Sequence, residues 1–127
     1  MSRSTAREVV FKLIFEYIFN LEADNDQLTD FLLENKDEQD YIQEAYHGII
    51  ENYNELCSIV RDNAVGFAFN RIFKVDLAIL LVALYEIKYM DSIPAKVSIN
   101  EALNLAKTYS TEKSNKFING ILASVVK

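Results

Sequence analysis

The sequence predicts an all-α fold, and three observations support this prediction. Glycine and proline number only 3 and 1, whereas sheets joined by tight turns need both residues. Apolar residues recur at helical spacing along most of the chain. Hydrophobic residues make up 50% and charged residues 25%, a balance typical of a globular domain of 127 residues. We therefore expect one helical domain that spans residues 1–127.

The first predicted helix begins at a capping box, Thr5 to Glu8, and runs to about Asn20. A short helix is expected over residues 26–34. A long helix follows, which we expect to continue without a break until about Asn63.

The C-terminal half predicts a central helix and two further helices. A short helical turn is expected at 67–69, and helices are expected over 76–93, 98–109 and 114–126. Residues 77–85 are apolar on every side, which is typical of a helix packed by neighbours all round. Pro94 ends that helix because proline cannot continue it, and a second capping box, Ser98 to Glu101, begins the next one.

The net charge of −6 is distributed unevenly along the chain. Residues 16–55 hold twelve acids and one base, whereas the rest of the chain carries a charge of +5. A basic surface can act while an acidic one lies across the molecule, because charges are screened within ~8 Å at physiological salt. We interpret the acidic segment as a solvated helix surface, with contact to another factor as the alternative.

Several classes of function have no support in the sequence. His47 and Cys57 are the only residues of their types and have no catalytic partners nearby in sequence. The acidic residues 34–40 lack the glycine of a calcium loop. The longest apolar run, 77–85, is too short to cross a bilayer, and the N-terminus lacks a signal peptide. We expect a cytoplasmic protein that is not an enzyme and that uses no cofactor or metal.

Four stretches carry a sharper signal. Residues 71–87 read RIFKVDLAILLVALYEI and residues 93–102 read IPAKVSINEA, followed by LAKTY at 105–109 and SNKFINGIL at 114–122. Together with Ala6-Arg7-Glu8 near the start, this ordered series resembles the NusB family of transcription antitermination proteins.

The resemblance implies a fold of about seven helices arranged as two small packed bundles. It also implies a partner, the ribosomal protein NusE, and a joint ligand, the single-stranded boxA element of nascent ribosomal RNA. The complex would join RNA polymerase in an antitermination complex that suppresses premature termination. A homodimer in the free state is compatible with this role.

Candidate RNA-binding residues lie at two places in the sequence. Arg3 and Arg7 lie at the tip of the first helix, where free backbone N–H groups favour phosphate. The second group combines cations, amides and an aromatic ring, which suit phosphates, base edges and stacking. Its members are Lys113, Asn115, Lys116, Phe117 and Asn119. Phe117 could equally belong to the core, and close helix packing at Gly120 is an alternative to RNA contact there.

The resemblance points to Phe15, Tyr85 and Glu86 as residues that bind the protein partner. A carboxylate at the end of an apolar stretch must find solvent or a cation. We expect Glu86 to pair with the basic ribosomal protein, and an ion pair within the chain, with Lys88 or Lys74, is the alternative.

The chain departs from the family pattern in having only two arginines near its start, and we expect no basic tail after the last helix. If about two to four phosphates are neutralised, the log–log salt dependence of RNA binding has a slope of roughly −1.5 to −3. The competing interpretations are a NusB-like scaffold that binds protein only, and the RNA-binding module of an RNA methyltransferase. The second is less favoured because we expect no catalytic domain.

Overall fold

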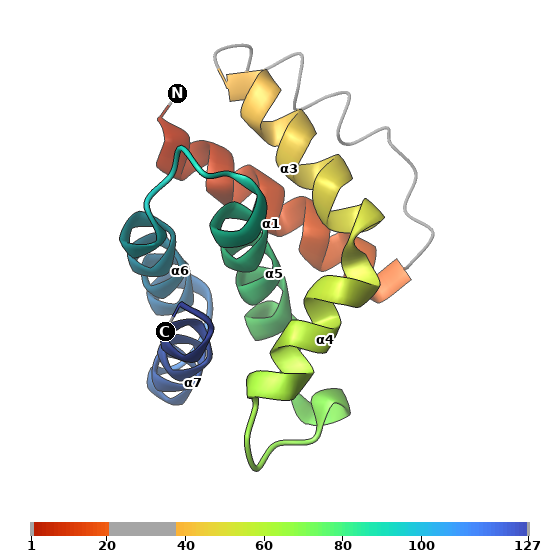
Figure 1. Ribbon diagram of the computed structural model, residues 1–127, viewed down its shortest axis with the longest axis vertical. Coiled ribbons are helices and arrows are strands. Elements are labelled where there is room, and N and C mark those ends of the chain that lie inside the picture. Colours follow the sequence, from red (N-terminus) through yellow and green to blue (C-terminus); the bar gives the residue numbers. More distant parts are fainter. Residues whose placement is uncertain (1, 21–37, 127) are drawn as a thin grey trace.

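The computed structural model describes residues 2–20 and 38–126. Within these residues the chain forms six α-helices, a single short 3-10 helix and no strand, so the all-α prediction is confirmed (Figure 1). The elements are α1 (Arg3–Asn20), α3 (Gln39–Glu51), α4 (Tyr53–Asn63), η2 (Phe69–Arg71), α5 (Lys74–Tyr89), α6 (Ala95–Tyr109) and α7 (Glu112–Val125). The predicted helix at 26–34 lies outside the described residues.

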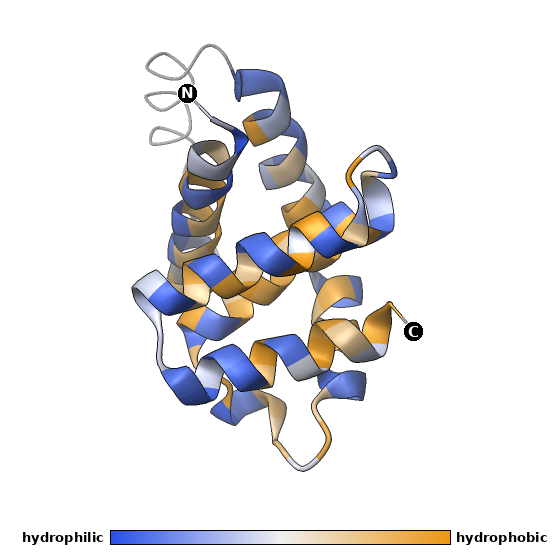
Figure 2. Ribbon diagram, turned by 90° about the vertical axis from the view of Figure 1, so that its left-hand side faces the viewer, coloured by the Kyte–Doolittle hydropathy of each residue, from blue (hydrophilic) through white to orange (hydrophobic). Residues whose placement is uncertain are grey.

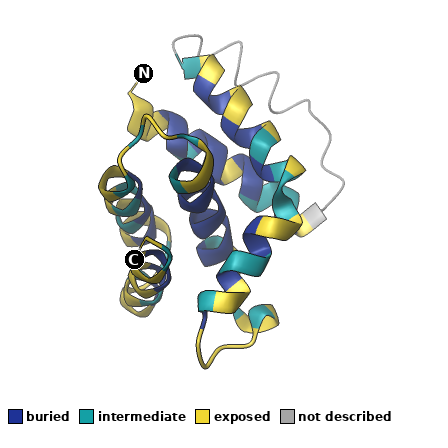
Figure 3. Cartoon of the chain, in the orientation of Figure 1, coloured by how far each residue is buried: buried dark blue, intermediate teal, exposed yellow. Residues whose placement is uncertain are grey.

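Helix α5 occupies the centre of the molecule, as its apolar sequence predicted. Every residue from Asp76 to Glu86 is buried, and the helix packs against α1, α3, α4, α6 and α7 (Figure 3). The α1–α3 pair and the α6–α7 pair therefore both pack against α5, which gives the predicted two-bundle arrangement. Among the described residues, no helix has the length and apolar character needed to cross a bilayer.

Two predicted helix starts are wrong by about one turn. Helix α1 begins earlier, because the Oγ of Ser2 accepts a hydrogen bond of 3.1 Å from the backbone N–H of Thr5. Helix α6 begins at Ala95, directly after Pro94, so Ser98 lies inside the helix and is buried. In both cases a capping pattern in the sequence lies inside a helix that starts further upstream.

The long helix predicted up to Asn63 is two helices, α3 and α4, which separate at Asn52. The Nδ2 of Asn52 donates a hydrogen bond of 2.8 Å to the carbonyl oxygen of Gly48. Asparagine side chains compete with the backbone for helix carbonyls in this way. Periodicity alone did not reveal the break, because both helices keep an inward apolar stripe.

Replacing Gly48 by alanine is expected to destabilise the fold. A Cβ at this position would overlap the buried ring of Tyr85, so α3 and α5 would have to move apart. Overpacking of this kind costs about 1–3 kcal/mol, more than the helix propensity gained by alanine. Urea unfolding followed by circular dichroism measures the difference, and an unchanged midpoint would contradict the close approach of these helices.

Candidate nucleic-acid interface

A buried polar network joins the start of α1 to the centre of the fold. Arg7 is only 5% exposed, and its Nε donates to Glu86 Oε2 at 2.7 Å while its Nη1 donates to Glu101 Oε1 at 3.2 Å. Glu86 is 1% exposed and also accepts hydrogen bonds from Ser98 Oγ at 2.8 Å and from the Tyr41 hydroxyl. The network thus connects α1, α3, α5 and α6.

The structure places Arg7 and Glu86 inside this network, whereas the predicted contacts to a phosphate and to a protein partner would need them at the surface. Each neutralises the other inside the fold. A buried carboxylate needs a cation and hydrogen bonds to be tolerated. Glu86 therefore forms an ion pair within the chain, as the alternative interpretation had it, but its partner is Arg7 rather than Lys88 or Lys74. Lys88 instead pairs with Glu55 at 3.5 Å.

The Tyr41 hydroxyl makes the stability of the fold sensitive to alkaline pH. Burial, the negative charge of Glu86 and the hydrogen bond to it all raise the pKa of Tyr41 above its ordinary value of 10.0. A raised pKa in the folded state gives stability that is complete below pH 10.0 and is lost as pH rises toward the folded value. We expect the free energy of unfolding to fall above about pH 10 and to fall less steeply in Tyr41→Phe. Urea unfolding at a series of pH values measures this. An equally steep fall of the free energy of unfolding in the wild type and in Tyr41→Phe would contradict the prediction.

Arg3 is exposed at the start of α1 but has partners within the chain. Its Nε lies 2.8 Å from Glu38 Oε2, and its guanidinium lies 4.5 Å from the centroid of the Tyr41 ring. A phosphate at this position would therefore have to displace Glu38.

The predicted residues at the start of α7 lie largely at the surface. Lys113, Lys116 and Asn119 are exposed. The Nδ2 of half-buried Asn115 donates to the carbonyl oxygen of Leu103 at 3.2 Å, which leaves its Oδ1 as the remaining acceptor. Phe117 is also half-buried, packing against the core and meeting the Phe67 ring edge to face at 4.9 Å between centroids.

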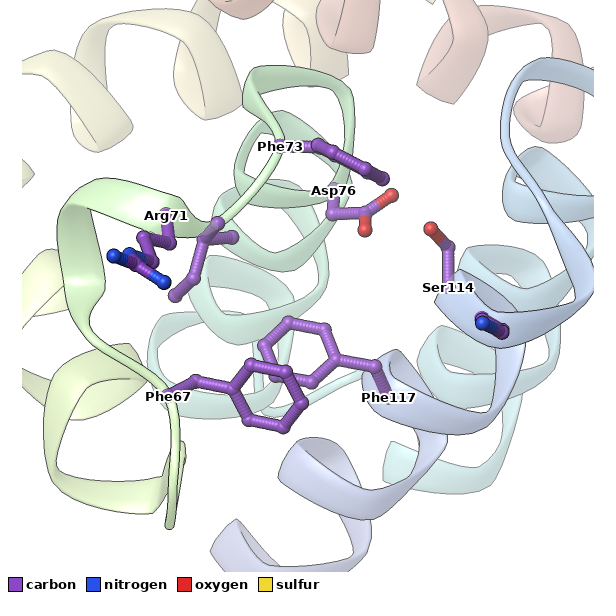
Figure 4. Close-up of a pocket in the computed structure, with 8 residues that line it drawn as sticks. Phe67, Arg71, Phe73, Asp76, Ser114 and Phe117 are labelled. Carbon is purple, nitrogen blue, oxygen red and sulfur yellow. The ribbon is translucent and has the colours of Figure 1, made fainter.

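The start of α7 lies between two cavities. The first, which we call the aromatic pocket, has a volume of about 230 Å³ (Figure 4). It is lined by Phe67, Arg71, Ile72, Phe73, Asp76, Lys113, Ser114 and Phe117. The second, the lysine cleft, has a volume of about 570 Å³ between the end of α6 and the start of α7. It is lined by Lys107, Ser110, Thr111, Glu112, Asn115 and Lys116.

Sequence reasoning missed Arg71 and Lys107, which the fold brings beside the predicted α7 residues. Both lie in the stretches that resemble the NusB family, so their positions were visible, but their proximity to α7 was not. Figure 2 shows α6 and α7 side by side, with hydrophilic residues recurring along their outer faces. The structure therefore gathers four cations, Arg71, Lys107, Lys113 and Lys116, around the start of one helix.

Gly120 is not a site of close helix packing. It is exposed in α7, and a Cβ there would meet no atom within 4 Å. Because glycine lowers helix stability relative to alanine, Gly120→Ala is expected to raise the free energy of unfolding by about 0.5–1 kcal/mol. An upward shift of the urea midpoint is the expected measurement, whereas a downward shift would show a packing constraint.

The two aromatic residues predicted to bind a protein partner differ in exposure. Tyr85 is buried against α3 and is only 7% exposed. Phe15 is half-buried and meets the Phe19 ring at 4.9 Å between centroids, while Phe19 itself is 59% exposed. The Nζ of Lys74 lies 5.3 Å from the Phe19 ring. Phe15 thus belongs to an aromatic surface at the end of α1, whereas Tyr85 belongs to the core.

Comparisons with known proteins agree on one family. The family model described as NusB family matches residues 4–127. A protein named transcription antitermination protein NusB from Agathobacter rectalis is 44% identical over 97% of this chain and 98% of its own length. A protein of the same name from Listeria monocytogenes is 39% identical over 98% of this chain and 96% of its own length.

Solved structures give the same result. A structure described as T. maritima NusB is similar with a TM-score of 0.90 at 33% identity, covering 98% of this chain and 90% of that chain. A crystal structure of antitermination factors NusB and NusE in complex with dsRNA has a TM-score of 0.85 at 22% identity, covering 97% and 94%, and this likeness supports the fold. From its sequence and its structure, this chain belongs to the NusB family.

Proposed function

We propose that this protein is a transcription antitermination factor that binds single-stranded boxA RNA of nascent ribosomal transcripts together with the ribosomal protein NusE. Its relatives carry the name transcription antitermination protein, and one structural neighbour holds NusB, NusE and RNA. The observation that carries the RNA-binding part is the group of four cations around the start of α7, next to an aromatic pocket.

The chemistry of this surface suits a single strand. Lys107 and Lys116 line one cleft, where they can neutralise phosphates. The Oδ1 of Asn115 and the exposed amide of Asn119 can pair with base edges, and the aromatic rings of the neighbouring pocket can stack on bases. The proposed RNA contacts are therefore Arg3, Arg71, Lys107, Lys113, Asn115, Lys116, Phe117 and Asn119.

For NusE we propose the aromatic surface around Phe15 and Phe19 at the end of α1. Aromatic side chains are enriched at protein interfaces, and the Phe19 ring is 59% exposed here. A single domain over residues 1–127, a cytoplasmic location, entry into the RNA polymerase antitermination complex and a free-state homodimer remain part of this proposal.

Fluorescence anisotropy of a labelled boxA-type RNA, with and without NusE, tests the proposal. We expect preference over a scrambled RNA of equal length and composition, and we expect NusE to tighten binding. If NusE binds but neither RNA does, the protein-only scaffold is the better description. If NusE also fails to bind, the family relationship reflects fold and ancestry alone.

A further inference from the structure

Two of the aromatic side chains that line the aromatic pocket are exposed to solvent rather than buried in the core. Phe67 is 59% exposed and Phe73 is 62% exposed, although both line a cavity. Figure 4 shows Phe73 and Asp76 facing Phe67 and Phe117 across this space. Large aromatic side chains that surround a cavity and stay accessible form a surface for a planar ligand.

A carboxylate lies at the inner wall of the same pocket. Asp76 is 3% exposed, and its Oδ1 accepts a hydrogen bond of 2.7 Å from Ser110 Oγ. An ionised carboxylate only accepts hydrogen bonds, and one hydroxyl leaves acceptor capacity on its oxygens. Arg71 and Lys113 also line the pocket, and both are exposed.

We propose that the aromatic pocket receives one unpaired guanine base of the bound RNA. The base stacks against the Phe67–Phe117 pair, and its N1–H and exocyclic N2–H donate toward the Asp76 carboxylate. Arg71 and Lys113 contact the flanking phosphates. This inference rests on the proposed function, because it names the base that one part of the RNA-binding surface selects.

The donor pattern of guanine decides between the four bases. Its Watson–Crick edge presents two adjacent N–H donors, which match an acceptor-only carboxylate. Adenine and cytosine place a ring-nitrogen acceptor beside their amino group, and uracil flanks its single N–H with two carbonyl oxygens. Each of these would direct a lone pair at Asp76.

The pocket suits a nucleobase better than an apolar side chain of a protein partner. A leucine or phenylalanine would cover the Asp76 carboxylate without donating a hydrogen bond to it, which is unfavourable for a buried charge. It would also leave the two cations, Arg71 and Lys113, without an anion. A guanine nucleotide satisfies the aromatic rings, the carboxylate and the cations together.

Phe67→Ala is the main test, because an exposed side chain can be removed without disturbing the core. The probes are oligouridines that carry one guanosine, inosine or adenosine, used with the full-length protein in the presence of NusE. We expect the wild type to prefer guanosine, since inosine lacks the N2 amino group. Phe67→Ala should weaken guanosine binding about tenfold, the usual effect of losing one base–aromatic stack.

Two further variants sharpen the test. Val65→Ala shortens an apolar side chain that is 88% exposed, two residues before Phe67, and that does not line the pocket, so it should leave the guanosine preference unchanged. Asp76→Asn should reduce the difference between guanosine and inosine, provided that its circular dichroism spectrum matches the wild type.

Three outcomes would overturn the inference in distinguishable ways. RNA binding without guanosine preference, and equal in Phe67→Ala, rejects the pocket and leaves the proposed function standing. Lost NusE binding by Phe67→Ala, with RNA binding unchanged, assigns the pocket to a protein side chain. Absence of RNA binding by the wild type with NusE present rejects both proposals.

Discussion

Replacing Arg7 by methionine is expected to lower the free energy of unfolding by about 3–5 kcal/mol, because removing one partner of a buried ion pair leaves the other charge uncompensated. The uncompensated group would be Glu86, which is 1% exposed at the centre of α5. Its remaining donors, Tyr41 and Ser98, are neutral hydroxyls. Urea unfolding followed by circular dichroism measures the loss.

The control is Arg3→Met, one turn earlier on the same helix. The Arg3 side chain is 44% exposed in its pair with Glu38, so its removal should cost about 0–1 kcal/mol. Equal effects of the two substitutions would contradict the buried network. The double variant Arg7→Met/Glu86→Leu should recover a large part of the loss, because apolar residues can replace a buried ion pair.

Replacing Lys113 and Lys116 together by glutamine is expected to weaken RNA binding about 25-fold at 0.1 M salt. Each phosphate contact to a single strand contributes about 0.7 to the log–log salt slope, so two lost contacts reduce its magnitude by about 1.4. Both lysines are exposed at the start of α7, so the fold should be unaffected.

Anisotropy titrations at several salt concentrations, with NusE present, measure this change. Lys96→Gln is the matched control, because Lys96 is an exposed lysine at the opposite end of α6 from the lysine cleft. The four cations around the start of α7 contribute about 2.8 to the magnitude of the wild-type slope and Arg3 contributes about 0.7 more, so the slope should lie between roughly −3 and −3.5. A slope steeper than about −5, or an unchanged slope in the double variant, would show that the RNA lies elsewhere.

The helical class and the central position of α5 could be predicted because both follow from local patterns. Spacing of apolar residues and scarcity of glycine and proline are properties of neighbouring residues, and residues 77–85 need packing on every side. The exposed cations of α7 were predictable for the same reason, because Lys113 and Lys116 lie near the start of a helix.

Helix boundaries were less predictable. The capping patterns at Thr5 and Ser98 fit either a helix start or a position inside a helix. The cap observed at Ser2 and the proline before Ala95 show that both patterns lie inside a helix. The break at Asn52 coincides with a side-chain hydrogen bond to the Gly48 carbonyl, which the spacing of apolar residues does not reveal.

The amino-acid sequence by itself determined the fold class, the family and the cationic start of α7. Tertiary structure alone decided which charges remain available to a ligand. Arg7 and Glu86 are 79 positions apart in the sequence, yet their burial side by side removes both from the surface. Packing likewise places Arg71 and Lys107 beside α7, from separate segments. The reason is that a charge in the interior must be neutralised there, and its partner is set by how helices pack rather than by spacing along the chain.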